Sequence, residues 1–343
     1  MAKRKWIITG GAGFIGCHSA ARFHGAGDHV VVVDNLSRRG ADANLEWLRA
    51  QGVADFVRAD VRDKDAIREV VDRHADADAV LHLAAQVAVT TSVADPRADF
   101  DTNALGTFNV LEAVRLAGGG PAVLYASTNK VYGNLEHVRV VERGGRYAYE
   151  DRPEGVDESE PLDFHSPYGC SKGAGDQYVR DYARIYGLKT VAFRQSCIYG
   201  TRQFGIEDQG WIAWFCLATQ RGQKFTIFGD GKQIRDTLWV DDLVDAYLAA
   251  VERIAAVSGE VFNVGGGPGN TLSLLELVAM LEARFGRELD PPFADWRPGD
   301  QRVFVADVRK AGRLLGWRPK VATADGVSRL LDWIGENKHL FTV

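Results

Sequence analysis

The sequence predicts an α/β fold in which a doubly wound parallel sheet is joined to a smaller C-terminal lobe. Three observations lead to this fold class. The first half of the chain alternates short β-rich runs with helical patterns. Residues 30–33 are four consecutive valines, a continuous apolar run that is typical of a strand covered on both faces. A glycine-rich turn at residues 10–16 lies between the first strand and the first helix.

Five strands are expected in the first half, with four helices between them. The strands are residues 6–9, 29–34, 55–59, 79–84 and 122–127, and the helices are 14–26, 41–51, 64–73 and 99–116. The polar segment 134–162, with its glycines and prolines, breaks this rhythm and predicts an inserted loop or hairpin near the site. A helix at 168–186 and a strand at 190–194 follow. The smaller C-terminal lobe is expected to hold helices near 211–221, 241–254, 273–284 and 323–334.

Composition and charge limit the class of protein. The 343 residues are 46% hydrophobic and 25% charged, enough apolar material for one large or two smaller domains. The net charge of −5 argues against partners such as nucleic acid or an anionic membrane surface. No apolar run approaches the roughly 20 residues that cross a bilayer, and the stretch after the basic start is too short for a signal peptide, so we expect a cytoplasmic protein. The four cysteines are widely spaced, which predicts neither disulfides nor a metal site.

The glycine-rich turn is the strongest local signal. Residues 9–16, Thr-Gly-Gly-Ala-Gly-Phe-Ile-Gly, leave a strand and open a helix, so the backbone can approach a pyrophosphate at the helix N-terminus. Asp34 ends the second strand, where a carboxylate accepts ribose hydroxyls and repels a 2′-phosphate. This pattern predicts a Rossmann-type NAD site, and the nearby Arg38 and Arg39 leave NADP as the alternative. Asp60 follows the third strand. It is expected either to bind the amino group of the cofactor's adenine or to cap the helix at 64–73.

Tyr168 and Lys172 form the second signal, because residues four apart share one helical face. A phenol with a pKa of about 10 is a poor base at neutral pH. The Lys172 ammonium and an oxidised nicotinamide are both expected to lower the pKa of Tyr168. Thr128 ends the fifth strand, beside the expected cofactor, where its hydroxyl can share the substrate's hydrogen bond. We therefore expect Thr128, Tyr168 and Lys172 to be the catalytic residues.

The two signals together define the expected cofactor site and the domains. Residues 1–188 are expected to form mainly the NAD-binding domain, and residues 189–343 mainly the substrate-binding lobe, with the chain free to cross between them. The expected cofactor-binding residues are Gly10, Gly13, Phe14, Ile15, Gly16, Asp34, Asn35, Ser37, Arg38, Asp60, Val61, Leu83, Ala84, Ala85, Tyr168 and Lys172.

The glycine-rich turn, Asp34, Ser127-Thr128 and Tyr168-x-x-x-Lys172 together resemble the extended short-chain dehydrogenase/reductase superfamily. The resemblance covers almost the whole chain. It includes residues 194–200, which are similar to the strand and loop after the catalytic helix, and residues 235–242, which are similar to the substrate-lobe signature. Membership implies a bound NAD, a nucleotide-sugar substrate and a homo-oligomer, either a dimer or a tetramer.

Residues 127–133, Ser-Thr-Asn-Lys-Val-Tyr-Gly, select a branch of this superfamily. Sugar-nucleotide 4,6-dehydratases place Asp-Glu after the threonine, where this chain has Asn129 and Lys130, and 4-epimerases have a small run such as Ser-Ala-Thr. The segment instead looks like the CDP-paratose 2-epimerases, also called CDP-tyvelose epimerases. So do residues 162–172 and 208–211.

The branch resemblance implies C2 inversion of a CDP-3,6-dideoxyhexose by transient oxidation and hydride return. Two alternatives stay open: another enzyme of the superfamily, such as a 4-epimerase or reductase, and a catalytically idle NAD-binding regulator. The chain departs from the branch pattern at Gln195, where the 2-epimerases tend to have histidine. It departs from the superfamily pattern at Cys197, where many extended members have an asparagine that contacts the sugar nucleotide. The substrate-binding residues that the resemblance implies are Gln86, Thr128, Asn129, Gln195, Ser196, Cys197, Arg235, Arg297 and Arg302, with no metal ligand.

Overall fold

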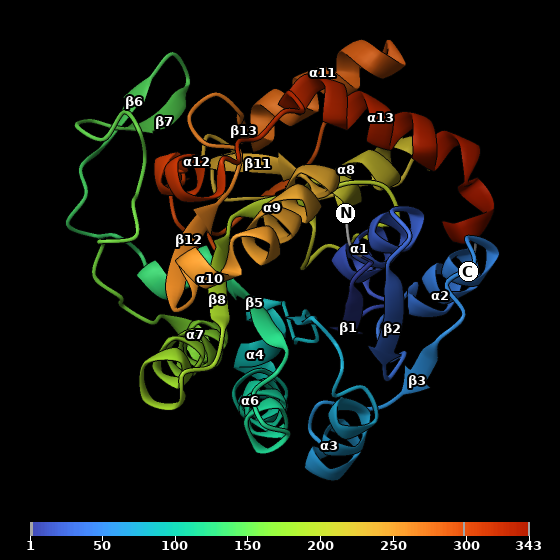
Figure 1. Cartoon of the computed structure of the whole chain (residues 1–343). Coiled ribbons are helices and arrows are strands. Elements are labelled where there is room, and N and C mark those ends of the chain that lie inside the picture. Colours follow the sequence, from blue (N-terminus) through green and yellow to red (C-terminus); the bar gives the residue numbers. More distant parts are fainter. Residues whose placement is uncertain (1–2, 298, 342–343) are drawn as a thin grey trace.

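A seven-stranded parallel sheet forms the centre of the computed structural model, which describes residues 3–297 and 299–341 (Figure 1). Its order is β12-β8-β5-β4-β1-β2-β3, and the neighbouring strands pair in parallel. This arrangement confirms the predicted fold class. The strands are β1 (Lys5–Thr9), β2 (His29–Asp34), β3 (Phe56–Arg58), β4 (Ala79–His82), β5 (Ala122–Thr128), β8 (Thr190–Gln195) and β12 (Glu260–Val264).

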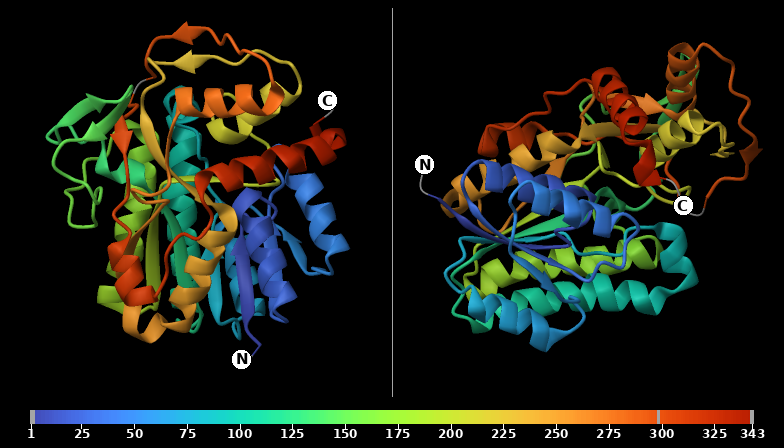
Figure 2. Two further views of the ribbon diagram at one scale, coloured as in Figure 1. Left: turned by 90° about the horizontal axis from the view of Figure 1, so that it is seen from above. Right: turned by 90° about the vertical axis from the view of Figure 1, so that its right-hand side faces the viewer.

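Helices cover both faces of this sheet, because successive strand residues point to opposite sides. In β1, Ile8 packs into the core beneath the first group of helices and Ile7 into the core beneath the second. Figures 1 and 2 show the two groups on opposite sides of the sheet. The first group is α1 (Phe14–Gly25), α2 (Ala41–Ala50) and α9 (Val240–Glu252), and the second is α3 (Lys64–Arg73), α6 (Gly106–Leu116) and α7 (Ser166–Tyr186).

The connection from β4 to β5 differs from the single helix that was expected at 99–116. It contains α4 (Val89–Ala94), α5 (Pro96–Phe100), a π-helical turn η1 (Asp101–Leu105) and then α6. Asp95 ends α4 and starts α5, because its side chain accepts a hydrogen bond from the Ala98 N–H and Pro96 occupies the first turn. The π-helical turn is a local widening of the helix of the kind often found near functional sites.

The second half of the chain contributes to both lobes. Strands β8 and β12 lie beyond residue 188 yet complete one side of the central sheet, so the chain crosses between the lobes. A domain boundary at residue 188 therefore stays a prediction. The second lobe contains β9 (Cys197–Tyr199), α8 (Trp211–Gln220), β10 (Ile227–Phe228), β11 (Ile234–Trp239), β13 (Thr271–Ser273), α11 (Leu274–Phe285), β14 (Phe293–Ala294), β15 (Val303–Phe304), α13 (Thr323–Glu336) and η3 (Lys338–Phe341). Helices α10 (Ile254–Val257) and α12 (Arg309–Leu315) pack with α9 on the core of the central sheet, so the helix expected at 241–254 does not belong to the C-terminal lobe.

The insertion at 134–162 forms a hairpin of β6 (Val140–Arg143) and β7 (Arg146–Tyr149). Gly144 and Gly145 make its two-residue turn with φ values of 60° and 79°, as a tight hairpin turn requires. The hairpin packs on the second lobe, where the Tyr147 hydroxyl donates to Asp230 at 2.6 Å. The hairpin prediction is therefore correct. Its expected place near the site stays a prediction; on the second lobe the Tyr149 hydroxyl also donates to the Val303 carbonyl, at 3.0 Å.

No helix in the described part of the chain combines the length and the apolar character that a membrane span requires.

Candidate active site

A cavity of about 380 Å³ lies at the carboxyl ends of the central strands, where open α/β sheets bind their ligands. Residues that follow β1, β2, β3, β4 and β5 line it, and residues 202–204 and Gln209 of the second lobe complete it. Every residue that the sequence predicts to bind the cofactor lines this cavity. The motifs are far apart in the sequence, but they meet at one edge of the sheet.

The glycine-rich turn provides a close backbone approach at the floor of the cavity. Gly10 has a φ of 70°, and a Cβ at this position would lie 2.6 Å from the Ala84 nitrogen. A Cβ on Gly16 would lie 2.2 Å from the Gly10 oxygen. Gly13 precedes α1 and provides no side chain that caps this helix. The first backbone N–H groups of α1 are therefore free to donate to a phosphate group in the cavity. This arrangement fits the pyrophosphate of a dinucleotide.

Asp34 lies at the place where a ribose would meet the sheet. Its carboxylate accepts hydrogen bonds from the Ala12 N–H at 3.0 Å and the Leu36 N–H at 2.8 Å. Burial raises the pKa of the Asp34 carboxyl, and these backbone N–H groups act in the opposite direction. Each carboxylate oxygen retains capacity to accept a further hydrogen bond, which suits the two hydroxyls of a ribose.

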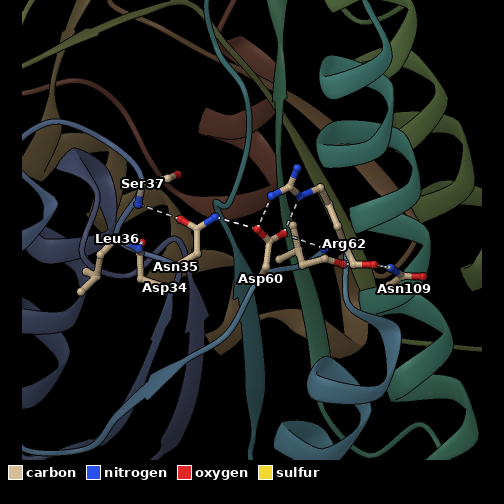
Figure 3. Close-up of polar contacts among 8 residues, drawn as sticks. Asp34, Asn35, Leu36, Ser37, Asp60, Arg62 and Asn109 are labelled. Carbon is tan, nitrogen blue, oxygen red and sulfur yellow. Dashed lines mark hydrogen bonds and ion pairs between the residues drawn. The ribbon is translucent and has the colours of Figure 1, made fainter.

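A polar network next to Asp34 shapes the adenine end of the cavity (Figure 3). Asn35 donates to Asp60 at 2.8 Å and accepts from the Ser37 N–H at 2.9 Å. Arg62 binds the same Asp60 carboxylate through Nε and Nη2, at 2.9 and 2.7 Å. The Arg62 hydrogen bonds lower the pKa of Asp60 to about 2. Asp63, not Asp60, caps α3, so the capping alternative for Asp60 is wrong.

Replacing Asp34 with alanine is expected to shift the NAD-to-NADP affinity ratio toward NADP by at least about tenfold, which corresponds to ~1.4 kcal/mol. The carboxylate that repels a 2′-phosphate is removed, while Arg38 and Arg39 remain on the cavity wall. Quenching of tryptophan fluorescence by each dinucleotide measures the ratio. Asp34→Asn is the matched control: it keeps one acceptor oxygen but no charge, and it is expected to shift the ratio in the same direction. An unchanged ratio in both variants would assign the discrimination to another group.

Tyr168 lines the other end of the cavity, and Thr128 lies beside it without lining the cavity itself. The Thr128 hydroxyl is hydrogen-bonded to the Tyr168 phenol, and both side chains are buried. Burial raises the pKa of Tyr168 to about 12, although the Thr128 hydrogen bond and Arg38 act against this. The expectation of a lowered pKa is therefore wrong for the protein chain by itself, because Lys172 does not offset the cost of burying the phenolate. The positive charge of an oxidised nicotinamide is the remaining contribution that would lower the pKa.

Lys172 lies one turn further along α7, and its ammonium is 4.3 Å from the centre of the Tyr125 ring. Burial lowers the pKa of Lys172 to about 7, and the through-space charges of Asp176 and Asp99 act in the opposite direction. The side chain lines the cavity, where its N–H groups can donate to a ribose hydroxyl.

Asn103, in the π-helical turn, braces the loop beyond β4. Its amide group exchanges two hydrogen bonds with the backbone of Gln86, at 2.9 and 3.0 Å. It also donates to Asp99 and to Ser171, each at 3.1 Å. The Gln86 side chain, predicted to bind substrate, instead donates to Asp99 and to the Ala88 carbonyl, each at 2.8 Å. Gln86 thus lines the cavity while its amide group holds the loop in place.

The other predicted substrate residues are divided between the cavity and the second lobe. Gln195 lines the cavity, but its amide donates to the Tyr247 hydroxyl at 2.5 Å. Asn129 is buried beside Thr128, and its side-chain oxygen accepts from the Thr128 hydroxyl at 3.4 Å. The Ser196 hydroxyl bonds to Asp236, and the Cys197 sulfur accepts from the Trp211 indole at 3.1 Å.

The three predicted arginines do not line the cavity, and each has a protein partner. Arg235 donates to Asp300 at 2.5 Å. Arg297 pairs with Asp208 at 3.3 Å and lies 3.9 Å above the centre of the Phe228 ring. Arg302 is exposed and lies over the Tyr147 ring of the hairpin, at 5.4 Å. A substrate-binding role for the three arginines therefore stays a prediction.

The sequence reasoning missed several residues that line the cavity, among them Arg62, Arg202, Phe204 and Gln209. The Arg38 guanidinium reaches the Gln209 side chain at 2.5 Å, so it bridges the two lobes across the cavity. Arg62 carried a local signal, because it stands two residues after Asp60 and hydrogen-bonds to it. Gln209 belongs to the motif at 208–211, but no pattern indicated that it lines the cavity. Arg202 and Phe204 come from a loop whose position depends on tertiary packing.

Comparison with known proteins adds independent findings. The model of the NAD dependent epimerase/dehydratase family matches residues 6–265. The chain is 46% identical to CDP-paratose 2-epimerase of Salmonella typhi, over 96% of this chain and 98% of that protein. It is 34% identical to UDP-glucose 4-epimerase of Mycolicibacterium smegmatis, over 95% and 97% of the two chains.

Two solved structures share the fold over nearly their full length. UDP-glucose 4-epimerase of Thermotoga maritima with UDP-glucose has a TM-score of 0.84 and 32% identity, covering 97% of this chain and 99% of that one. UDP-glucose 4-epimerase of Thermus thermophilus in complex with NAD has a TM-score of 0.80 and 32% identity, with the same coverage. Together with the cavity geometry, these matches identify NAD as the cofactor. The chain belongs to the NAD dependent epimerase/dehydratase family.

Proposed function

We propose that this enzyme inverts C2 of a CDP-linked 3,6-dideoxyhexose, interconverting CDP-paratose and CDP-tyvelose. The observation that carries the proposal is the 46% identity over 96% of the chain to a CDP-paratose 2-epimerase. The placement of Thr128, Tyr168 and Lys172 around one end of the NAD cavity supports it, since these residues supply what epimerisation by transient oxidation requires.

Each of these residues has a role that follows from its contacts. Tyr168 takes the proton of the sugar hydroxyl at the reacting carbon and later returns it. Thr128 shares the hydrogen bond at that oxygen, and Lys172, on the cavity wall, donates to a ribose hydroxyl of the cofactor. A bound NAD would supply reversible hydride acceptance at the sugar carbon; inversion follows when the hydride returns to the other face, and the reaction consumes no net oxidant or reductant. Holding these groups at fixed positions accounts for the remaining acceleration.

The residues that follow Thr128 argue against sugar dehydration. Asn129 is an amide and cannot exchange a proton as a carboxylic acid does, and Lys130 provides a cation. UDP-glucose 4-epimerisation is the second candidate, favoured by the 0.84 TM-score to an enzyme solved with UDP-glucose. The difference between the two candidates lies in the base and in the carbon that is inverted.

A panel of nucleotide sugars separates these candidates. CDP-paratose, CDP-tyvelose and the UDP- and GDP-linked hexoses are each incubated with the holoenzyme, and the products are identified by NMR. We expect inversion at C2 of the two CDP-linked sugars and no change in UDP-glucose. Inversion at C4 of UDP-glucose, with CDP-paratose unchanged, would replace the proposal with the second candidate.

We also propose that the enzyme forms a homo-oligomer through the outer face of α6 and α7. Large apolar side chains are exposed on this face: Phe108 is 37% exposed, Tyr178 47%, Tyr186 51% and Ile185 66%. Phe108 and Tyr178 also contact each other, with ring centres 5.7 Å apart, so the patch spans both helices. Such a continuous apolar face is typical of an interface between subunits. Sedimentation of the purified holoenzyme as a monomer would contradict this assembly.

A further inference from the structure

Asp99 is a buried carboxylate beside the catalytic groups that the proposed mechanism does not use. It belongs to α5 and is fully buried. Three neutral groups donate to it: the Ser171 hydroxyl at 2.5 Å, the Gln86 amide at 2.8 Å and the Asn103 amide at 3.1 Å. In the described part of the chain it forms no ion pair, and the charge that acts on it through space is that of Lys172. The three donors favour the ionised carboxylate, so a negative charge remains inside the protein.

Lys172 is the matching buried cation, because it also has no directly paired carboxylate. It is 3% exposed, and its ammonium lies over the face of the Tyr125 ring, 4.3 Å from the ring centre. The electron-rich face of an aromatic ring attracts a cation but carries no net charge. A buried cation is costly unless an anion compensates it, so Lys172 depends on the carboxylates around it.

Asp176, one turn further along α7, is the other carboxylate that acts on Lys172 through space. Taken alone, it acts more strongly than Asp99. The Arg194 guanidinium, however, donates to both oxygens of Asp176 at 3.0 Å, and Ser127 donates to the same carboxylate at 2.7 Å. The opposite charges of this pair largely cancel at a distance. Asp99 has no such cation of its own.

The remaining titratable groups that face Lys172 carry no charge at neutral pH. Burial lowers the pKa of His82, at the end of β4, to about 3. Burial raises the pKa of the Tyr125 phenol well above its usual range. In the protein chain alone, burial also raises the pKa of Tyr168 to about 12. Asp99 is therefore the anion that remains to balance Lys172.

We propose that Asp99 is the counter-anion of Lys172 and keeps its ammonium positively charged in the wall of the cavity. Asp99 does not line the cavity, so it is a positioning residue that acts through Lys172. The hydrogen bond from Ser171, the residue before Lys172, fixes the carboxylate against the helix that carries this cation. The same negative charge also raises the pKa of Tyr168.

Titration of Lys172 tests the inference without any substrate. Lysines of the holoenzyme are labelled with an NMR-active carbon isotope at Cε, and Lys172→Met identifies the Lys172 signal. Asp99→Asn removes the charge and keeps the shape of the side chain. It is expected to lower the pH at which Lys172 is half protonated by about one pH unit, the lower end of the effect of one nearby charge.

The pH dependence of turnover gives a second measurement, which rests on the proposed function because it uses CDP-paratose as substrate. Since the Asp99 charge raises the pKa of Tyr168, removing it favours the phenolate. Asp99→Asn is therefore expected to move the pH range over which the rate rises to lower pH. A residue that only holds the fold would change the rate without moving this range.

Two control variants separate the charge of Asp99 from its hydrogen bonds. Asp101→Asn removes a negative charge from the adjacent π-helical turn, where it acts on Arg62 and not on the catalytic groups. Ser171→Ala removes one hydrogen bond from Asp99 and keeps the charge. Both controls are expected to leave the titration of Lys172 and the pH range of the rate in place. NAD content and thermal unfolding show whether each variant is folded.

The coupling is reciprocal, which gives a test that does not depend on the folding of Asp99→Asn. The Lys172 charge lowers the pKa of Asp99, so Lys172→Met is expected to raise it. The NMR signal of the Asp99 carboxyl carbon, assigned in the wild type, reports this change. An Asp99 that is already protonated at neutral pH in the wild type, or whose titration is the same in Lys172→Met, would overturn the inference.

The other contradicting results concern the variants of Asp99 and Ser171. If Asp99→Asn is folded and leaves the Lys172 titration unchanged, Asp99 only holds the loop of Gln86 and the inference is wrong. If Ser171→Ala moves that titration as far as Asp99→Asn does, the hydrogen bonds and not the charge are responsible. Coupled titrations of Asp99 and Lys172 in an enzyme that does not convert CDP-paratose would support the inference and reject the proposed function alone.

Discussion

Tyr168→Phe is expected to lower turnover by at least about 10²-fold, the lower end of the usual contribution of a general acid or base. The substitution removes one hydroxyl and keeps the buried ring, so NAD content and thermal unfolding are expected to stay close to wild type. The rate of the wild type is expected to rise with pH over the range in which the Tyr168 phenolate forms. The protein chain alone raises the pKa of Tyr168 to about 12, and the positive charge of a bound, oxidised nicotinamide is expected to lower it. In Tyr168→Phe, the rate is expected not to rise with pH over this range.

Tyr182→Phe is the matched control, because it changes the same residue type on the same helix. The Tyr182 hydroxyl donates to Glu112 at 2.7 Å and does not line the cavity. Steady-state assays of both variants at several pH values make the comparison. If Tyr168→Phe stays within a few-fold of wild type, or if Tyr182→Phe is equally slow, the assignment of Tyr168 as the base is wrong.

Arg194→Leu is expected to lower the free energy of unfolding by about 3–5 kcal/mol, the cost of leaving one partner of a buried ion pair uncompensated. Arg194 is 2% exposed and Asp176 is fully buried. The guanidinium donates to both oxygens of Asp176 at 3.0 Å, and Ser127 donates to the same carboxylate at 2.7 Å. This network ties β5, α7 and β8 together directly beneath the catalytic residues.

Urea unfolding of the NAD-bound enzyme measures this loss. Two control variants allow this loss of unfolding free energy to be interpreted. Arg68→Leu breaks an exposed ion pair with Asp72 and is expected to cost under about 1 kcal/mol. The double variant Asp176→Leu with Arg194→Leu removes both buried charges and is expected to recover much of the loss. If Arg194→Leu lowers the free energy of unfolding by less than about 1 kcal/mol, the buried negative charge of Asp176 does not depend on Arg194 for its stabilisation.

The cofactor side of the site could be predicted from the sequence because it depends on local signals. Each predicted residue follows a strand, and the carboxyl ends of parallel strands meet at one edge, so spacing along the chain is enough to bring Gly10, Asp34 and Ala84 together. The helix of Tyr168 and Lys172 is likewise defined by a local pattern.

The substrate side could not be predicted in the same way, because its partners are distant in the sequence. Arg235 binds Asp300 and Arg297 binds Asp208, and neither pairing has a spacing rule. Arg302 lies over the Tyr147 ring of the hairpin, a contact that no local pattern in the sequence indicates. The raised pKa of Tyr168 was missed for a related reason: burial is a property of the folded chain and outweighs the influence of a neighbouring charge.

The central claim is that C2 is inverted by transient oxidation, with the hydride returned to the same carbon. Conversion of CDP-paratose carrying deuterium at C2 tests it most directly, with NMR and mass spectrometry of the CDP-tyvelose formed in ordinary water. We expect the product to keep its deuterium at C2, and the labelled substrate to react more slowly if hydride transfer limits the rate. Unlabelled substrate in deuterated water is expected to gain no deuterium at C2. Loss of the label to solvent, or solvent deuterium at C2, would contradict it.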